Sequence, residues 1–132
     1  MQTVQDIKPE TLTTYGAIRK ACRVIRSAAA ENAGKVFDYT RANKYTMSHE
    51  DAATLHHDAY MEFHYNEVDC FDYVEDTLTW ETETRNWMTE EGTIKDEYIT
   101  KHEGNIKYWQ KAVADELKNY NAAKKVMDKY IK

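Results

Sequence analysis

The chain has 132 residues, of which 42% are hydrophobic and 31% are charged, and its formal net charge is −5. These values are typical of a single globular domain, residues 1–132, and one Pro with four Gly favours long elements joined by few turns. No apolar run approaches the roughly 18 residues of a membrane span, and the first ten residues lack the apolar core of a signal peptide. We therefore expect a cytoplasmic protein with no membrane partner.

Pro9 suits the first position of a helix, because its missing N–H would have no partner there. Beyond it, residues spaced by three and four form one continuous stripe, which predicts a long helix with one buried face. The stripe consists of Tyr15, Ile18, Cys22, Ile25, Ala29, Asn32, Val36 and Tyr39. Residues 43–46 break the pattern and predict a connection.

Ser48 and Asp51 have the spacing of a helix cap, so a second helix is predicted to begin near Ser48. Residues 77–84 alternate as a strand would, but a lone strand would have no pairing partner, and helix is favoured there. The expected core stripe of this helix consists of Ala53, His57, Tyr60, His64, Glu67, Phe71, Val74 and Leu78.

A third helix is predicted after a similar cap at Thr93 and Asp96. Its stripe consists of His102, Ile106, Trp109, Val113, Glu116, Tyr120, Ala123, Met127 and Tyr130. The sequence therefore predicts an all-α fold, an elongated antiparallel bundle of three long helices. The alternative is four helices, with a break at Gly104.

Charge is divided into three blocks along the chain. Residues 48–91 hold thirteen Asp and Glu against one basic residue, Arg85, whereas residues 1–47 have a net charge of +4 and residues 92–132 of +3. The simplest interpretation is structural, because an acidic middle helix would pair with basic helices on either side and so fix their order.

Antiparallel packing would bring Asn32, Glu116 and Tyr120 to the level of His64 and Glu67. We expect a buried hydrogen-bond network in this layer that fixes the register of the helices. His64 and Glu67 have a spacing that would also suit two metal ligands, but the duplicated Glu-x-x-His pattern of di-iron bundles is missing. We predict no metal, no cofactor and no enzymatic activity.

A second stripe on the middle helix alternates acidic with aromatic residues. It consists of Asp69, Tyr73, Asp76, Trp80, Glu83, Trp87 and Glu90. One interpretation is that its aromatic residues widen the core. The other is a binding face, because Tyr and Trp dominate interface hot spots and the carboxylates would select a partner with a basic surface. Exposed aromatic residues on a slender bundle also predict a homo-oligomer.

The expected function is therefore non-enzymatic protein binding through this stripe. In its size, acidity and Tyr content the chain resembles phage accessory proteins that block host proteins, which implies an inhibitor of a basic, nucleic-acid-binding protein. The alternative is a structural subunit of a virion or scaffold, or a helical protein that binds nucleic acid. Arg19, Lys20, Arg23 and Arg26 form a basic patch, but the net charge of −5 argues against direct nucleic-acid binding.

Overall fold

The computed structural model describes residues 2–66, 68 and 96–131, and of residues 15 and 96–105 it describes only the backbone. Every regular element in these residues is helical, which confirms the predicted all-α class for this part of the chain. Residues 77–84, for which strand was the alternative, lie outside it. None of the described helices is long and apolar enough to cross a bilayer.

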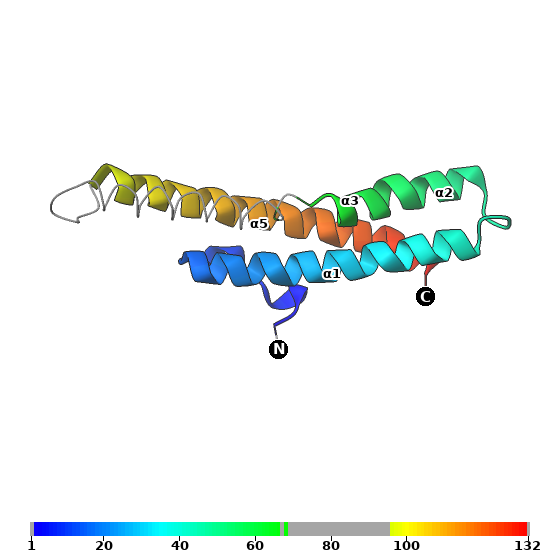
Figure 1. The fold of residues 1–132 in the computed structure, drawn as a ribbon, viewed down its shortest axis with the longest axis horizontal. Coiled ribbons are helices and arrows are strands. Elements are labelled where there is room, and N and C mark those ends of the chain that lie inside the picture. The colour runs from blue at the N-terminus through cyan, green and yellow to red at the C-terminus, as the bar shows by residue number, and fades with distance from the viewer. Residues whose placement is uncertain (1, 67, 69–95, 132) are drawn as a thin grey trace, which may run out of the picture.

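Three long helical segments form the described fold. The first is α1 (Tyr15–Ala42), the second is built from α2 (His49–Leu55), the π-helical turn η3 (His56–Tyr60) and α3 (Met61–His64), and the third is α5 (Asp96–Tyr130). Figure 1 shows α1 and α5 running in the same direction, with the second segment running back. α1 and α5 contact each other, and each of them also contacts the second segment.

The chain does not enter a long helix at Pro9, as the sequence suggested. Pro9–Thr11 forms a single 3-10 turn, η2, and α1 begins only at Tyr15. Thr14 is the N-cap, since its hydroxyl accepts a hydrogen bond from the Ala17 N–H at 3.1 Å. Leu12, at the end of η2, has a non-helical backbone and a buried side chain, so its docking into the core competes with helix extension.

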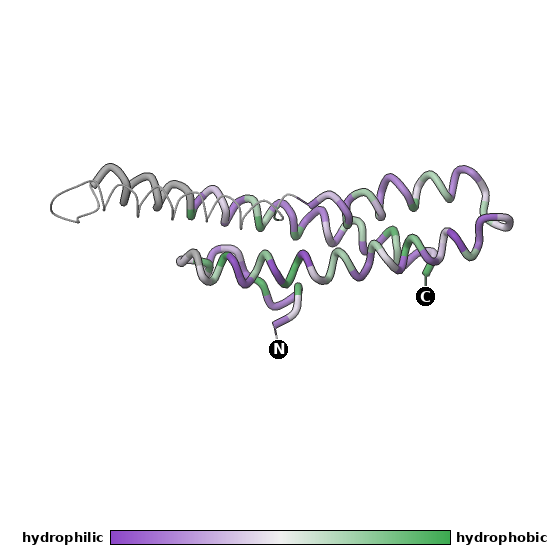
Figure 2. Tube along the Cα trace, in the orientation of Figure 1, coloured by the Kyte–Doolittle hydropathy of each residue, from purple (hydrophilic) through white to green (hydrophobic). Residues whose placement is uncertain are grey.

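The predicted stripe of α1 is confirmed over most of its length. Figure 2 shows hydrophobic residues recurring at short intervals along this helix. Its buried members are Ile18, Cys22, Ile25, Ala29, Asn32 and Val36, and Tyr39 is half-buried. The helix ends at Ala42, and the predicted connection follows.

The second segment begins as predicted but buries a different face. Ser48 is the N-cap, and its hydroxyl accepts from the Asp51 N–H at 3.1 Å. The expected core positions Ala53, His57 and His64 are exposed, whereas Leu55, Ala59 and Phe63 are buried.

The segment buries the face with Leu55 and Phe63 because that face is more apolar than the face with His57 and His64. Burial of Leu55 and Phe63 removes more apolar surface from water than burial of two imidazoles, whose nitrogens would need partners in the core. The segment also ends at His64, earlier than expected, because Tyr65 leaves the helical conformation with φ −109° and ψ 65°. Glu67, Phe71, Val74 and Leu78 lie outside the described residues.

The third helix shows no break at Gly104, since α5 continues through it. A glycine costs about 1 kcal/mol of helix propensity, which the packing of the next turns readily offsets. The predicted stripe is confirmed over most of the positions whose side chains are described. Ile106 and Tyr130 at its two ends are half-buried, and the buried members are Trp109, Val113, Glu116, Tyr120, Ala123 and Met127. The predicted cap residue Thr93 lies outside the described residues.

The core contains two apolar clusters, and a polar layer lies at the level of the second. One cluster contains Ile18, Ile25 and Val113, and the other contains Val36, Phe63 and Met127. In the polar layer, buried Asn32 donates a hydrogen bond from Nδ2 to the Tyr120 hydroxyl at 2.9 Å, and Glu116 is also buried. The predicted layer is thus present in part, since His64 is exposed and Glu67 lies outside the described residues.

We expect Tyr120→Phe to lower the free energy of unfolding by about 1–3 kcal/mol, because the buried Asn32 amide loses its acceptor. Urea denaturation measures this change. The matched control is Tyr108→Phe, since Tyr108 is 63% exposed and its variant should stay within about 0.5 kcal/mol of the parent. Equal stability of both variants would contradict a register-fixing role for this hydrogen bond.

Candidate partner-binding groove

The residues of the predicted acidic-aromatic stripe lie outside the part of the chain that the structure describes. These are Asp69, Tyr73, Asp76, Trp80, Glu83, Trp87 and Glu90. Their proposed role in binding therefore stays a prediction. The predicted basic patch, in contrast, lies on a described helix.

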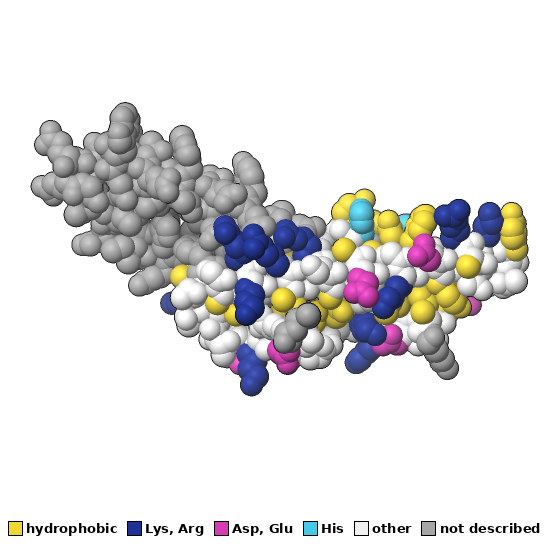
Figure 3. All heavy atoms as spheres, turned by 60° about the horizontal axis from the view of Figure 1, so that its bottom comes forward, with side chains coloured by type: hydrophobic (Ala, Val, Ile, Leu, Met, Phe, Trp, Pro, Cys, Tyr) yellow, Lys and Arg dark blue, Asp and Glu magenta, His cyan; other side chains and the backbone are white. Residues whose placement is uncertain are grey.

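The basic patch occupies the N-terminal half of α1. Lys20 and Arg23 are exposed, and Arg19 and Arg26 are half-buried. Figure 3 turns this side of the molecule to the front, where Lys and Arg side chains gather over the same half of α1. Arg19, Lys20 and Arg23 line a groove, and Arg26 is not among its lining residues.

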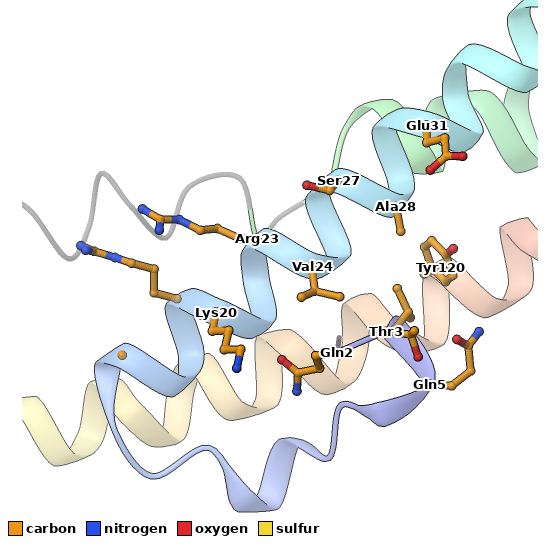
Figure 4. A pocket seen from close by; sticks show the side chains of 13 residues that line it. Gln2, Thr3, Gln5, Lys20, Arg23, Val24, Ser27, Ala28, Glu31 and Tyr120 are labelled. Atoms are coloured by element: carbon orange, nitrogen blue, oxygen red, sulfur yellow. The ribbon is translucent and has the colours of Figure 1, made fainter.

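The groove runs between α1 and the N-terminal segment (residues 2–12), and it has a volume of about 620 Å³. It is lined by Gln2, Thr3, Val4, Gln5, Gly16, Arg19, Lys20, Arg23, Val24, Ser27, Ala28, Glu31 and Tyr120. Lys20 and Gln2 extend toward each other from opposite walls in Figure 4, whereas the end of Arg23 projects outward from the rim. The lining residues of α1 recur at spacings of three and four, so they share one face of the helix.

The floor of the groove is apolar and rigidly held. Val24 and Ala28 of α1 are half-buried and pack against the core, and Tyr120 of α5 is 6% exposed. The Tyr120 ring is fixed on two sides, by the hydrogen bond from Asn32 and by an edge contact with Phe63 at a centroid distance of 5.4 Å. The groove therefore exists before any ligand arrives.

The N-terminal segment forms the second wall because its apolar residues are buried in the core. Val4, Ile7 and Leu12 are each less than 10% exposed. The Leu12 carbonyl also accepts a hydrogen bond from Gln110 Nε2 of α5 at 2.7 Å. These contacts hold the polar residues of the segment beside α1.

A local hydrogen-bonded turn shapes the part of this wall nearest the groove. The Asp6 carboxylate accepts hydrogen bonds from the Thr3 N–H at 2.8 Å and from the Thr3 hydroxyl at 3.0 Å. These bonds, that of the backbone foremost, lower the pKa of Asp6 below its ordinary value of 3.8. The carboxylate is therefore ionised at neutral pH, and the turn η1 (Val4–Asp6) is held closed there.

The electrostatics of the groove are positive at one end. Among the residues that the structure describes, neither Lys20 nor Arg23 has an ion-pair or hydrogen-bond partner. The Glu31 carboxylate, at the other end, lies 3.4 Å from Lys35 Nζ, so its charge is partly offset. A ligand in this groove would meet cations at its rim and apolar side chains beneath.

The histidines of the second segment form a surface ladder of stacked rings. The ring of Tyr60 stacks on His56 at a centroid distance of 5.5 Å and on His64 at 5.4 Å. Tyr60 and His56 also line a recess of about 320 Å³ beside Phe37 of α1, which is 54% exposed. Sequence spacing placed His57 and His64 on the core stripe, whereas the structure exposes both side chains to solvent.

The N-terminal wall of the groove was not predicted from the sequence. Three apolar residues before the cap residue Thr14 could have indicated that this segment is buried. They are Val4, Ile7 and Leu12. Such an irregular segment has no helical period, so its burial was not evident from spacing.

No protein-family model matches the sequence, and no curated protein or solved structure matches it.

The stability of the turn η1 beside the groove should depend on pH in the acid range. Because the pKa of Asp6 is lowered in the folded state, its hydrogen bonds stabilise the turn above about pH 3.8 and are lost as the pH falls through the lowered pKa. A carbon-13 NMR titration should give Asp6 a midpoint below 3.8, and Thr3→Ala should raise that midpoint. An Asp6 midpoint unchanged by Thr3→Ala would show that the hydroxyl does not hold the carboxylate.

Proposed function

We propose that the chain is a single helical-bundle domain, residues 1–132, that acts without catalysis by binding another protein. In this proposal its three long helical segments form an elongated bundle in which the middle segment runs antiparallel to the other two. The observation that supports a binding role is the groove beside α1, because it combines a preformed apolar floor with two cations that have no partner among the described residues. Binding sites for protein segments share this combination of apolar anchors and a charged rim.

Protein is favoured over nucleic acid as the partner. A nucleic-acid site needs a continuous basic surface, whereas this groove has a floor of Val24, Ala28 and Tyr120 and a Glu at one end. The net charge of −5 would also repel a polyanion before it reached the groove. A virion or scaffold subunit remains the alternative, since such a subunit would use the same kind of surface to join its neighbours.

The acidic-aromatic stripe is proposed as a second binding surface for a partner with a basic surface. Its support is the sequence alone, in which Tyr73, Trp80 and Trp87 alternate with carboxylates. An inhibitor of a nucleic-acid-binding protein would use this surface against a basic cleft. A second copy of the chain is another candidate partner, because α1 presents the complementary cations.

Blocking the groove tests the binding role. We expect Ser27→Trp to fill the groove and to abolish capture of the protein partner from the native host, because Ser27 is exposed and lines the groove. Ala30→Trp is the matched control, since Ala30 is an exposed residue of the same helix that does not line the groove. Mass spectrometry of the captured proteins gives the readout, after circular dichroism has shown equal melting temperatures.

A second arm of the same experiment compares the two proposed surfaces. The combined change Asp76→Lys with Glu83→Lys should remove a partner that binds the stripe. If this variant loses the partner while Ser27→Trp retains it, the stripe is the binding surface and the groove is not. Retention of every captured protein by both variants would contradict the proposed function.

A further inference from the structure

The groove beside α1 has features that select one kind of protein segment. The α1 residues that line it extend from Gly16 to Glu31, about 22 Å along the helix axis. A segment of three to four helical turns has about this length. The groove is thus long enough for a short helix, and its volume of about 620 Å³ is too small to take in a folded domain.

The distribution of charge along the groove decides which segment fits. Lys20 and Arg23 lie one turn apart at its N-terminal end, and both side chains are exposed. No described carboxylate pairs with either of them. A carboxylate from a ligand would therefore meet two exposed cations that no described carboxylate already holds.

The floor supplies the apolar part of the recognition. Val24 and Ala28 are one turn apart on α1, and the Tyr120 ring closes the space beneath them. Ala28 and Ser27 are small, so a large side chain of a ligand can approach the helix closely. The Tyr120 hydroxyl is already bonded to Asn32, so the ring presents its apolar body to the groove at no cost in hydrogen bonds.

From these features we infer that the groove binds an acidic amphipathic helix of a partner protein. Apolar side chains of that helix, spaced by three and four residues, would rest on Val24, Ala28 and Tyr120. Asp or Glu residues beside them would pair with Lys20 and Arg23. This inference rests on the proposed protein-binding function and names the chemistry of the partner at the same groove.

The test begins with a library of random helical peptides, displayed and selected for binding to the full chain. Peptides that also bind Ser27→Trp are removed, so that only groove-dependent sequences remain. We expect the remaining peptides to be enriched in Asp and Glu next to apolar residues spaced by three and four. A groove-dependent set without acid enrichment, or no groove-dependent peptide at all, would overturn the inference.

The best selected peptide then gives a quantitative test by fluorescence anisotropy. The combined change Lys20→Glu with Arg23→Glu should weaken its binding at least tenfold, because attraction becomes repulsion at the rim. The matched control reverses two exposed lysines of α5, Lys111→Glu with Lys118→Glu, and should change the affinity less than twofold. Equal losses for both variants would indicate only a general field effect and would contradict the inference.

A charge swap provides the sharpest outcome. A peptide with its acidic residues replaced by Lys should not bind the parent but should bind the Lys20→Glu, Arg23→Glu variant. Recovery of binding in this pair requires direct contact between the exchanged charges, which loss of folding cannot imitate. If single-stranded DNA displaced the acidic peptide at comparable concentrations, the groove would be a phosphate site instead.

Failure of this inference and failure of the proposed function are distinguishable. Host capture that depends on Ser27 but not on Lys20 and Arg23 would leave the protein-binding role intact and remove the acidic helix as the ligand. Host capture that is independent of Ser27 would remove the groove from the function altogether.

Discussion

The described structure depends on the seam between α1 and α5. Ile25 and Val113 are fully buried along it, and Asn32 and Tyr120 form a hydrogen bond within it. An apolar seam alone tolerates sliding by a helical turn, whereas a buried polar pair is satisfied in one register only. That register places Tyr120 beneath Val24 and Ala28. The same bond that orders the core thus sets the floor of the groove.

The groove also requires the N-terminal segment. Val4, Ile7 and Leu12 bury their side chains in the core, and Gln110 of α5 bonds the Leu12 carbonyl. The segment therefore lies across two helices and turns an ordinary helix surface into a groove with two walls. Arg19, Lys20 and Arg23 line this groove, so a recess and cations that would attract an acidic ligand lie on the same side of α1. This coincidence is the physical basis of the proposed binding role.

Much of the fold followed from sequence spacing, and the exceptions have identifiable causes. The stripes of α1 and α5 were predictable because Ile, Val, Trp and Met lie on one face of each helix and no other face is as apolar. The second segment offers two faces, and spacing alone selected the one with His57 and His64 over the one with Leu55 and Phe63. A π-helical turn also shifts the register there, which a constant period of 3.6 residues cannot anticipate. The basic patch was predicted, but its groove depends on contacts between distant residues, Leu12 with Gln110 and Asn32 with Tyr120, which are 98 and 88 positions apart.

The groove has two walls only if the N-terminal segment is docked on α1 and α5 in the free protein. Amide hydrogen exchange measured by NMR at Ile7 and Leu12 tests this docking most directly, because both N–H groups bond within single 3-10 turns that an isolated peptide would not maintain. We expect exchange well below the intrinsic rate at both amides, and faster exchange at Leu12 in Gln110→Ala. Exchange at the intrinsic rate in the parent protein would contradict this docking, since the groove would then lack its second wall.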